Sequence, residues 1–128
     1  MKSTYKMALA MLAGGTLGAA AVSGLYAQAK PLAYAITEVE IIDQTAFNEF
    51  SPKVPATMAP FGGKYLVRGG KVAALPGEGE PPKRVIVSVF DSMEKAQAWR
   101  DSAAWKDLTP LRVKAVKTRA YIVEGITN

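Results

Sequence analysis

The segment Lys83–Phe90, which reads KRVIVSVF, constrains the fold more than any other part of the sequence. Its apolar run is nearly continuous and rich in β-branched residues, which is typical of a strand. Because apolar residues occupy both alternating sets of positions, both faces of such a strand are covered in the folded protein. The sequence therefore predicts a central strand whose second face also needs a partner.

Three further segments have strand character. They are Ala33–Ile42, in which apolar and acidic residues alternate, Lys64–Arg68 and Arg119–Glu124. Lys71–Leu75 is a candidate extension of the pairing after a glycine turn. The following segment, Pro76–Pro82 (PGEGEPP), is rich in proline and glycine and is expected to be an exposed loop.

The first helical region follows Asp43, a residue suited to cap a helix N-terminus. An apolar stripe at helical spacing follows the cap, formed by Phe47, Phe50 and Val54. Three prolines interrupt this region at positions 52, 55 and 60. We therefore expect a kinked or two-part helix that ends at Gly62-Gly63, where glycine can adopt the left-handed conformation.

The second helical region is expected to begin at Ser92, which caps Met93–Arg100. Ser102 is placed to start the helix again, and the restarted helix runs toward Val116. Thr109-Pro110 is expected to distort it, because proline lacks the backbone donor that a helix interior requires.

The order strand, helix, strand, strand, helix, strand predicts a ferredoxin-like α+β sandwich, βαββαβ, with an antiparallel four-stranded sheet. The expected sheet order is fourth, first, third, second, with the first and third strands side by side and parallel. Helices on one face leave the other face of the central strand bare. A second copy of the sheet is the simplest cover, which predicts a homodimer.

Two blocks of sequence resemble the domain-of-unknown-function 1330 (DUF1330) family. The first is Lys53–Gly70 (KVPATMAPFGGKYLVRGG) and the second is Phe90–Trp99 (FDSMEKAQAW), although Asp91 departs from the residues that are usual there. The resemblance covers about residues 33–125. It implies a dimeric α/β-barrel fold close to that of antibiotic-biosynthesis-type monooxygenases, and it implies no activity, because the family is uncharacterised.

The first 29 residues have the pattern of a signal peptide. Lys2 and Lys6 precede an apolar stretch from Met7 to about Tyr26, and Ala27-Gln28-Ala29 is a small-x-small cleavage site. The sequence thus divides into a signal peptide, 1–29, and one domain, 30–128, exported to the periplasm or secreted. The alternative is an uncleaved N-terminal membrane anchor. We expect cleavage after Ala29, and the intact mass of the exported protein checks it, since retention of Met1 on a membrane-bound product contradicts it.

Composition excludes several kinds of chemistry. The chain contains no cysteine and no histidine, which rules out thiolate nucleophiles, histidine-based triads and histidine-ligated zinc or haem. No cofactor-binding fingerprint or calcium loop is present, so we expect no cofactor and no metal. Two of the 16 basic residues lie in the predicted signal peptide, and the remaining 14 are scattered and stand against 11 acidic residues, so we expect no nucleic-acid partner. No later segment approaches the length of a membrane helix, so we expect no membrane partner after cleavage.

Candidate ligand-binding residues come from strand alternation. We expect Tyr34, Ile36, Glu38 and Glu40 of the first strand and Arg84, Ile86, Ser88 and Phe90 of the third to face the partner sheet. The opposite residues, Thr37, Val39, Ile41, Val85, Val87 and Val89, are expected to meet the helices. Glu38, Arg84 and Ser88, joined by Leu66 and Arg68, would then form a concave site for a ligand with a carboxylate or enolate.

Each of these residues also has a structural interpretation. Glu38 and Arg84 can simply pair within the dimer interface. Trp99, a further candidate for ligand binding, and Trp105 form either a ligand cage or core or interface packing. Tyr65 is either a proton donor beside a pocket or a packing residue of its strand.

Three classes of function remain open on this basis. The first is a homodimer that binds a small acidic or aromatic molecule between its sheets. The second is a cofactor-independent monooxygenase- or isomerase-like enzyme in which Glu38 moves a proton and arginines stabilise an enolate. The third is a structural or stress-related dimer with no ligand.

Overall fold

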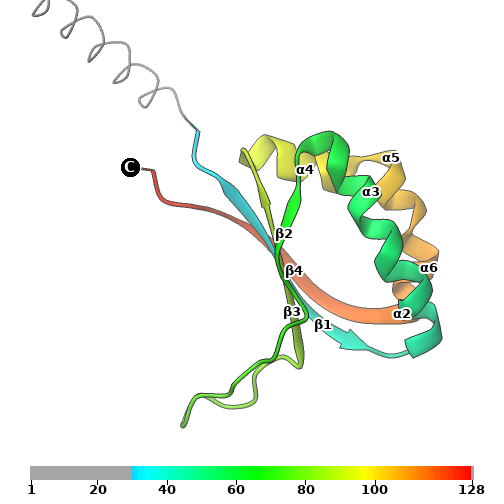
Figure 1. Cartoon of the computed structure of the whole chain (residues 1–128), viewed down its shortest axis with the longest axis vertical. Helices are drawn as coiled ribbons and strands as arrows, with labels where there is room; N and C mark the ends of the chain where they lie inside the picture. The colour runs from blue at the N-terminus through cyan, green and yellow to red at the C-terminus, as the bar shows by residue number, and fades with distance from the viewer. Residues whose placement is uncertain (1–29, 128) are drawn as a thin grey trace, which may run out of the picture. The chain divides into compact units, whose positions relative to one another are not determined.

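A four-stranded sheet with helices along one face makes up the domain that the structure describes (Figure 1). The computed structural model describes residues 30–127, so the predicted signal peptide lies outside the described residues. Residues 31–127 form one unit. Its strands are β1 (Ala33–Ile41), β2 (Lys64–Arg68), β3 (Arg84–Phe90) and β4 (Val116–Glu124). Its helices are α2 (Gln44–Phe50), η1 (Ser51–Lys53), α3 (Val54–Met58), η2 (Ala59–Phe61), α4 (Met93–Asp101), α5 (Ala103–Asp107) and α6 (Thr109–Ala115).

The sheet has the order β2-β3-β1-β4, and every neighbouring pair is antiparallel. The predicted α+β class, the βαββαβ order and the strand order are confirmed. The parallel alignment expected for β1 and β3 is wrong. A βαβ unit returns the chain to the start of the sheet, so β2 runs parallel to β1, and the arm of residues 69–83 then brings β3 back antiparallel to both.

Local sequence explains the two-part first helix. The carboxylate of Asp43 accepts a hydrogen bond from the backbone N–H of Ala46 (2.9 Å), as an N-cap does. Prolines stand in the first turns of the segments that follow, where a missing N–H costs least, so the helix restarts as short 3₁₀ and α pieces. Gly62 ends the series at φ 72°, the left-handed conformation expected there.

The second helical region also follows its caps. Ser92 Oγ accepts from the backbone N–H of Lys95 (3.2 Å), and Ser102 Oγ accepts from that of Trp105 (3.3 Å). Pro110 occupies the first turn of α6, so it begins a new helix at Thr109 rather than only bending one. The last strand starts at Val116, three residues before its predicted start.

Residues 69–83 form an arm that leaves the lower end of the sheet on the side away from the helices (Figure 1). The expected extension of strand pairing over Lys71–Leu75 is wrong, since the arm has no strand. Gly69 has a φ of 69°, and a Cβ at that position would collide with the guanidinium of Arg84. Glycine therefore lets the chain turn off the sheet while Arg84 lies against it.

The core lies between the sheet and the helices. Phe90 and Met58 are its most deeply buried large residues, each 1% exposed. The ring of Phe90 stacks on Trp99 at 5.3 Å between centroids, and Trp99 contacts Trp105 at 4.8 Å. Among residues 30–127, no helix has the length and apolar character needed to cross a bilayer.

Strand register fixes which side chains face this core. Ala35 lies opposite Ser88, and Val39 opposite Arg84, and directly paired residues share a face. The expected orientation of β1 is confirmed for Thr37, Val39 and Ile41. That of β3 is wrong: Arg84, Ile86, Ser88 and Phe90 face the helices, and Val85, Val87 and Val89 face away from them.

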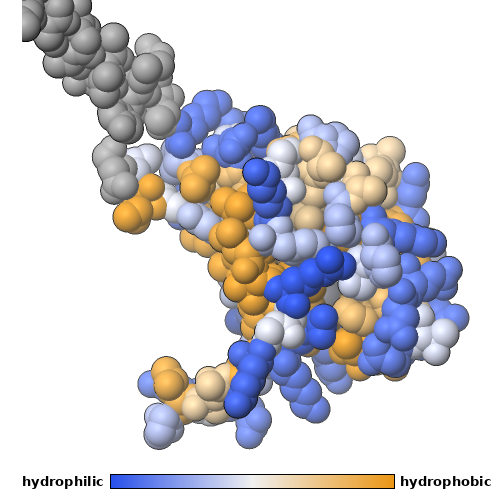
Figure 2. Space-filling model, viewed as in Figure 1, coloured by the Kyte–Doolittle hydropathy of each residue, from blue (hydrophilic) through white to orange (hydrophobic). Residues whose placement is uncertain are grey.

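The face of the sheet turned from the helices is largely apolar, although Glu38, Glu40, Lys64, Lys117 and Arg119 also lie on it. It carries Tyr34, Ile36, Val67, Val85, Val87, Val89, Tyr121 and Val123. Figure 2 shows an orange apolar strip along this hollowed side, above the projecting arm. In the single chain Val67, Tyr121 and Val123 are more than 40% exposed. Alternation alone does not distinguish the two faces of a strand that is apolar on both, which is why the orientation predicted for β3 is wrong.

Candidate functional site

A cavity of about 50 Å³ lies between the helices and the sheet. Apolar and aromatic side chains make most of its wall: Val39, Phe47, Phe50, Val54, Ile86, Trp99, Trp105 and Val116. The polar groups of the wall are Thr37, Ser51, Tyr65, Arg100, Arg112 and Thr118. This volume is the space open to the centres of water molecules, of which one water needs roughly 10–15 Å³. The cavity therefore has room for a few waters or a compact organic group.

Arg100 of α4 and Arg112 of α6 bring two positive charges to this cavity. The Arg100 guanidinium carbon lies 4.5 Å from the ring centroid of Trp105, and that of Arg112 lies 5.7 Å from it. In the part of the chain that the structure describes, no aspartate or glutamate lines the cavity or pairs with either arginine. Burial lowers the pKa of Arg100 from its ordinary value, and the charge of Arg112 lowers it further.

One donor in this pair has no acceptor. The Nε of Arg112 is buried and makes no hydrogen bond within residues 30–127. An unsatisfied buried donor is costly, and so are two like charges beside one ring. Both costs fall when an anion accepts hydrogen bonds from the two guanidinium groups.

Tyr65 lines the cavity from β2, as one of the residues predicted to form a site. Burial raises the pKa of its hydroxyl from the ordinary value, and the charge of Arg68 opposes part of that shift. Tyr65 is therefore a neutral hydrogen-bond donor at physiological pH. Arg68 packs over its ring at 4.6 Å and donates from Nη2 to the backbone oxygen of Ser51 (3.2 Å) and to its Oγ (3.3 Å).

Trp99 is both a core residue and part of the cavity wall. It is 4% exposed, and its Nε1 donates to Thr57 Oγ1 at 2.9 Å. Thr57 in turn donates to the backbone oxygen of Val54 at 2.6 Å. This chain of hydrogen bonds fixes the indole, so Trp99 offers the cavity a ring face rather than a free donor.

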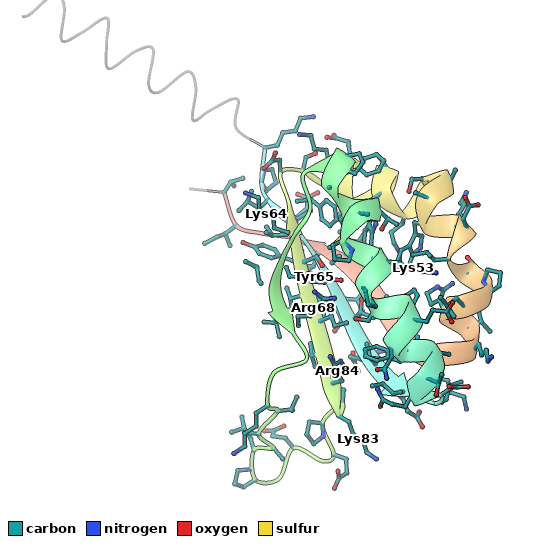
Figure 3. All side chains as sticks on the ribbon, turned by 45° about the vertical axis from the view of Figure 1, so that its right-hand side comes forward. Lys53, Lys64, Tyr65, Arg68, Lys83 and Arg84 are labelled. Carbon is teal, nitrogen blue, oxygen red and sulfur yellow. The ribbon has the colours of Figure 1, made fainter. Side chains whose placement is uncertain are left out.

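Arg84 and Ser88 lie on the helix side of the sheet but outside the cavity wall. Figure 3 shows Tyr65, Arg68 and Arg84 between the sheet and the helices. The Arg84 guanidinium carbon lies 5.0 Å from the ring centroid of Phe47, and its Nε is buried without a hydrogen bond among the described residues. Ser88 is 3% exposed between Ala35 and Tyr65, where a small side chain fits.

Glu38 is separated from these residues by the sheet itself. It lies on the face turned from the helices, opposite Arg119 of β4 in the register. Its Oε2 accepts from Arg119 Nε (3.1 Å), Arg119 Nη2 (3.0 Å) and the Tyr121 hydroxyl (3.2 Å). These hydrogen bonds and the Glu38 charge raise the pKa of Arg119. The expected grouping of Glu38 with Arg84 and Ser88 is wrong, because it followed from the wrong orientation of β3.

Sequence reasoning missed Arg100 and Arg112. Both stand on the buried stripes of their helices: Met93, Ala96 and Arg100 follow spacings of three and four, as do Leu108, Arg112 and Ala115. The sequence signal that could have revealed them is a charged residue at a position where the helical spacing predicts an apolar one. The acids are dispersed by contrast, since residues 30–127 contain no group of three acidic side chains close enough to hold a metal ion.

Comparison with known proteins identifies the family. Residues 32–126 match the family described as a domain of unknown function, DUF1330. The chain belongs to the DUF1330 family. The resemblance seen in the sequence is thereby confirmed for nearly the whole of the described domain. No curated protein matches the sequence.

Solved structures confirm the fold of this DUF1330 protein. The RPA0582 protein of unknown function from Rhodopseudomonas palustris superposes with a TM-score of 0.62 at 12% identity, over 84% of this chain and 93% of that one. SnoaB, a cofactor-independent oxygenase from Streptomyces nogalater, gives 0.55 at 7% identity, over 77% and 96%. A conserved protein of unknown function from Bacteroides thetaiotaomicron gives 0.52 at 12% identity, over 76% and 100%. At these identities the likeness concerns the fold alone.

Proposed function

We propose that this protein binds a small organic acid in the cavity between its helices and its sheet. The observation that carries the proposal is the pair of guanidinium groups of Arg100 and Arg112 on one apolar cavity without a carboxylate from residues 30–127. The carboxylate of the acid accepts from both arginines, and the Tyr65 hydroxyl is a further donor. The carbon skeleton contacts the aromatic wall.

The same geometry favours binding over proton-transfer catalysis. An isomerase needs a base beside the substrate carbon, and the residue predicted for that role, Glu38, lies on the opposite face of the sheet. The described wall residues supply no carboxylate to replace it. The second candidate function is a cofactor-independent enzyme, and the fold shared with a cofactor-independent oxygenase supports it. In such an enzyme Arg100 and Arg112 would stabilise an enolate form of the substrate.

Binding is tested by titration calorimetry with acetate, butanoate and benzoate. Arg112→Met keeps the packing of the side chain on Trp105 and removes its charge. We expect it to raise the Kd of the acids at least about tenfold, because a charge-assisted hydrogen bond in a dry cavity is lost. Lys114→Ala removes a charge from the exposed surface of the same helix and is the matched control, with less than about a twofold change.

Thermal melting separates this role from a structural one. Arg112→Met relieves the repulsion of Arg100 and removes an unsatisfied donor, so we expect the melting temperature without ligand to stay the same or rise. Absence of binding of every acid to the unaltered protein at millimolar concentration contradicts the proposal. So does a variant that loses stability while it binds acids as before.

We further propose that the protein is an exported homodimer. Support for the dimer comes from the apolar sheet face, because soluble monomers seldom expose a contiguous apolar patch of that kind. A twofold contact buries this face against the identical face of a second copy. The Glu38–Arg119 pair lies on the same face, where its charges already neutralise each other. Support for export is the sequence pattern of residues 1–29 alone.

A further inference from the structure

A second hollow adjoins the cavity on the helix side of β4. It measures about 370 Å³, and it shares two wall residues with the cavity, Thr37 and Arg100. It exists because the helices leave the middle of β4 uncovered: Thr118 and Ala120 belong to the face that the helices pack on, and both are exposed. Arg100 therefore stands at the boundary between an inner cavity and an outer groove.

The two compartments differ in chemistry. The inner cavity is lined by both arginines of the pair and by Tyr65. The outer groove is lined mainly by Ala35, Met93, Ala120 and Ile122, with the amide of Gln97 as a polar group. An anionic head group therefore fits the inner side of Arg100, and an apolar tail fits the outer side.

We propose that the ligand is an amphiphilic monocarboxylic acid, whose carboxylate lies at Arg100 and Arg112 and whose alkyl or aryl tail lies in the groove over β4. This inference rests on the proposed acid binding and adds the substrate class. The inner cavity alone has room for the head group and little more, whereas the groove has the volume typical of a site for an aryl ring or a medium alkyl chain. Met93 suits tails of different shape, because its side chain is flexible.

The test is a calorimetric series with acetate, butanoate, hexanoate and octanoate. We expect the affinity of the unaltered protein to rise about two- to fourfold for each methylene group, the upper value being that of full burial. Ala120→Phe fills the groove from a strand position where an aromatic residue is well tolerated. We expect this variant to lose the gain with chain length and to bind acetate within about twofold of the unaltered protein.

Ala98→Phe is the matched control. It introduces the same ring at an exposed position of α4 that lines neither compartment, and we expect it to keep the full chain-length dependence.

If the unaltered protein binds acetate but its affinity does not rise with the chain length of the acid, the inference is overturned and the proposed function stands. Failure of every acid to bind overturns both. The inference is also overturned if Ala120→Phe weakens acetate by as large a factor, relative to the unaltered protein, as it weakens octanoate, because head and tail then do not occupy separate compartments.

Discussion

Phe90→Ala is expected to lower the free energy of unfolding by about 3–5 kcal/mol, the range for removing a fully buried phenylalanine side chain. Phe90 is 1% exposed, stacks on Trp99 at 5.3 Å, and lies at the end of the central strand. Small domains have a total stability of about 5–15 kcal/mol, so the variant should retain only a part of it. Urea denaturation followed by tryptophan fluorescence measures the change.

Two further variants serve as references for the loss of stability in Phe90→Ala. Leu66→Ala truncates a side chain that is 58% exposed, and we expect it to cost less than about 1 kcal/mol. Gly63→Ala approaches the same ring from the other side, because a Cβ there would lie 2.5 Å from Phe90 Cε1 and 3.0 Å from Met58 Cβ. It should therefore destabilise as well, through overpacking. A loss of less than 1 kcal/mol for Phe90→Ala contradicts the packing described for the core.

Local signals made most of the fold predictable. Asp43, Ser92 and Ser102 each cap the helix they were expected to cap, because a side-chain acceptor before an apolar stripe acts within a few residues. Gly62 ends the first helical region for an equally local reason. The end of β2 at Arg68 is also as predicted, but the course of the arm was not predictable in this way. Pairing of Lys71–Leu75 depends on whether a partner strand continues beside it, and β3 begins only at Arg84.

The site was predicted less well because its residues meet through long-range register. Tyr65 and Trp99 were singled out and both line the cavity. The predicted grouping of Glu38, Arg84 and Ser88 on one face requires the three valines of β3 to face the helices. In the structure those valines face away from the helices. A strand that is apolar on both faces gives no local indication of which face the helices cover, so a shift by one residue reverses every assignment.

Val87→Asp tests the proposed dimer. It also tests the orientation of β3, in which Val87 and not Ile86 faces away from the helices. Val87 lies between Ile36 of β1 and Val67 of β2 in the register, near the middle of the apolar face. In a twofold interface the substitution introduces two carboxylates, each costing several kcal/mol when buried without a partner. We expect the Kd of the dimer to rise at least about a thousandfold, which light scattering and analytical ultracentrifugation measure as a monomer at micromolar concentration. Circular dichroism should be unchanged.

Ile86→Asp, one residue earlier, should give the opposite result. Ile86 faces the helices, packs against the core and lines the cavity, so its replacement places an unpaired charge in the fold itself. For Ile86→Asp we expect lost secondary structure or a sharply lower melting temperature. For Val87→Asp we expect a folded monomer. Val113→Asp, on the exposed surface of α6, is the control that should remain a folded dimer. A Val87→Asp protein that stays dimeric contradicts the proposed interface. An Ile86→Asp protein that is stable and monomeric means that β3 presents its other face to the partner, because only a charge at the interface separates the subunits without unfolding them.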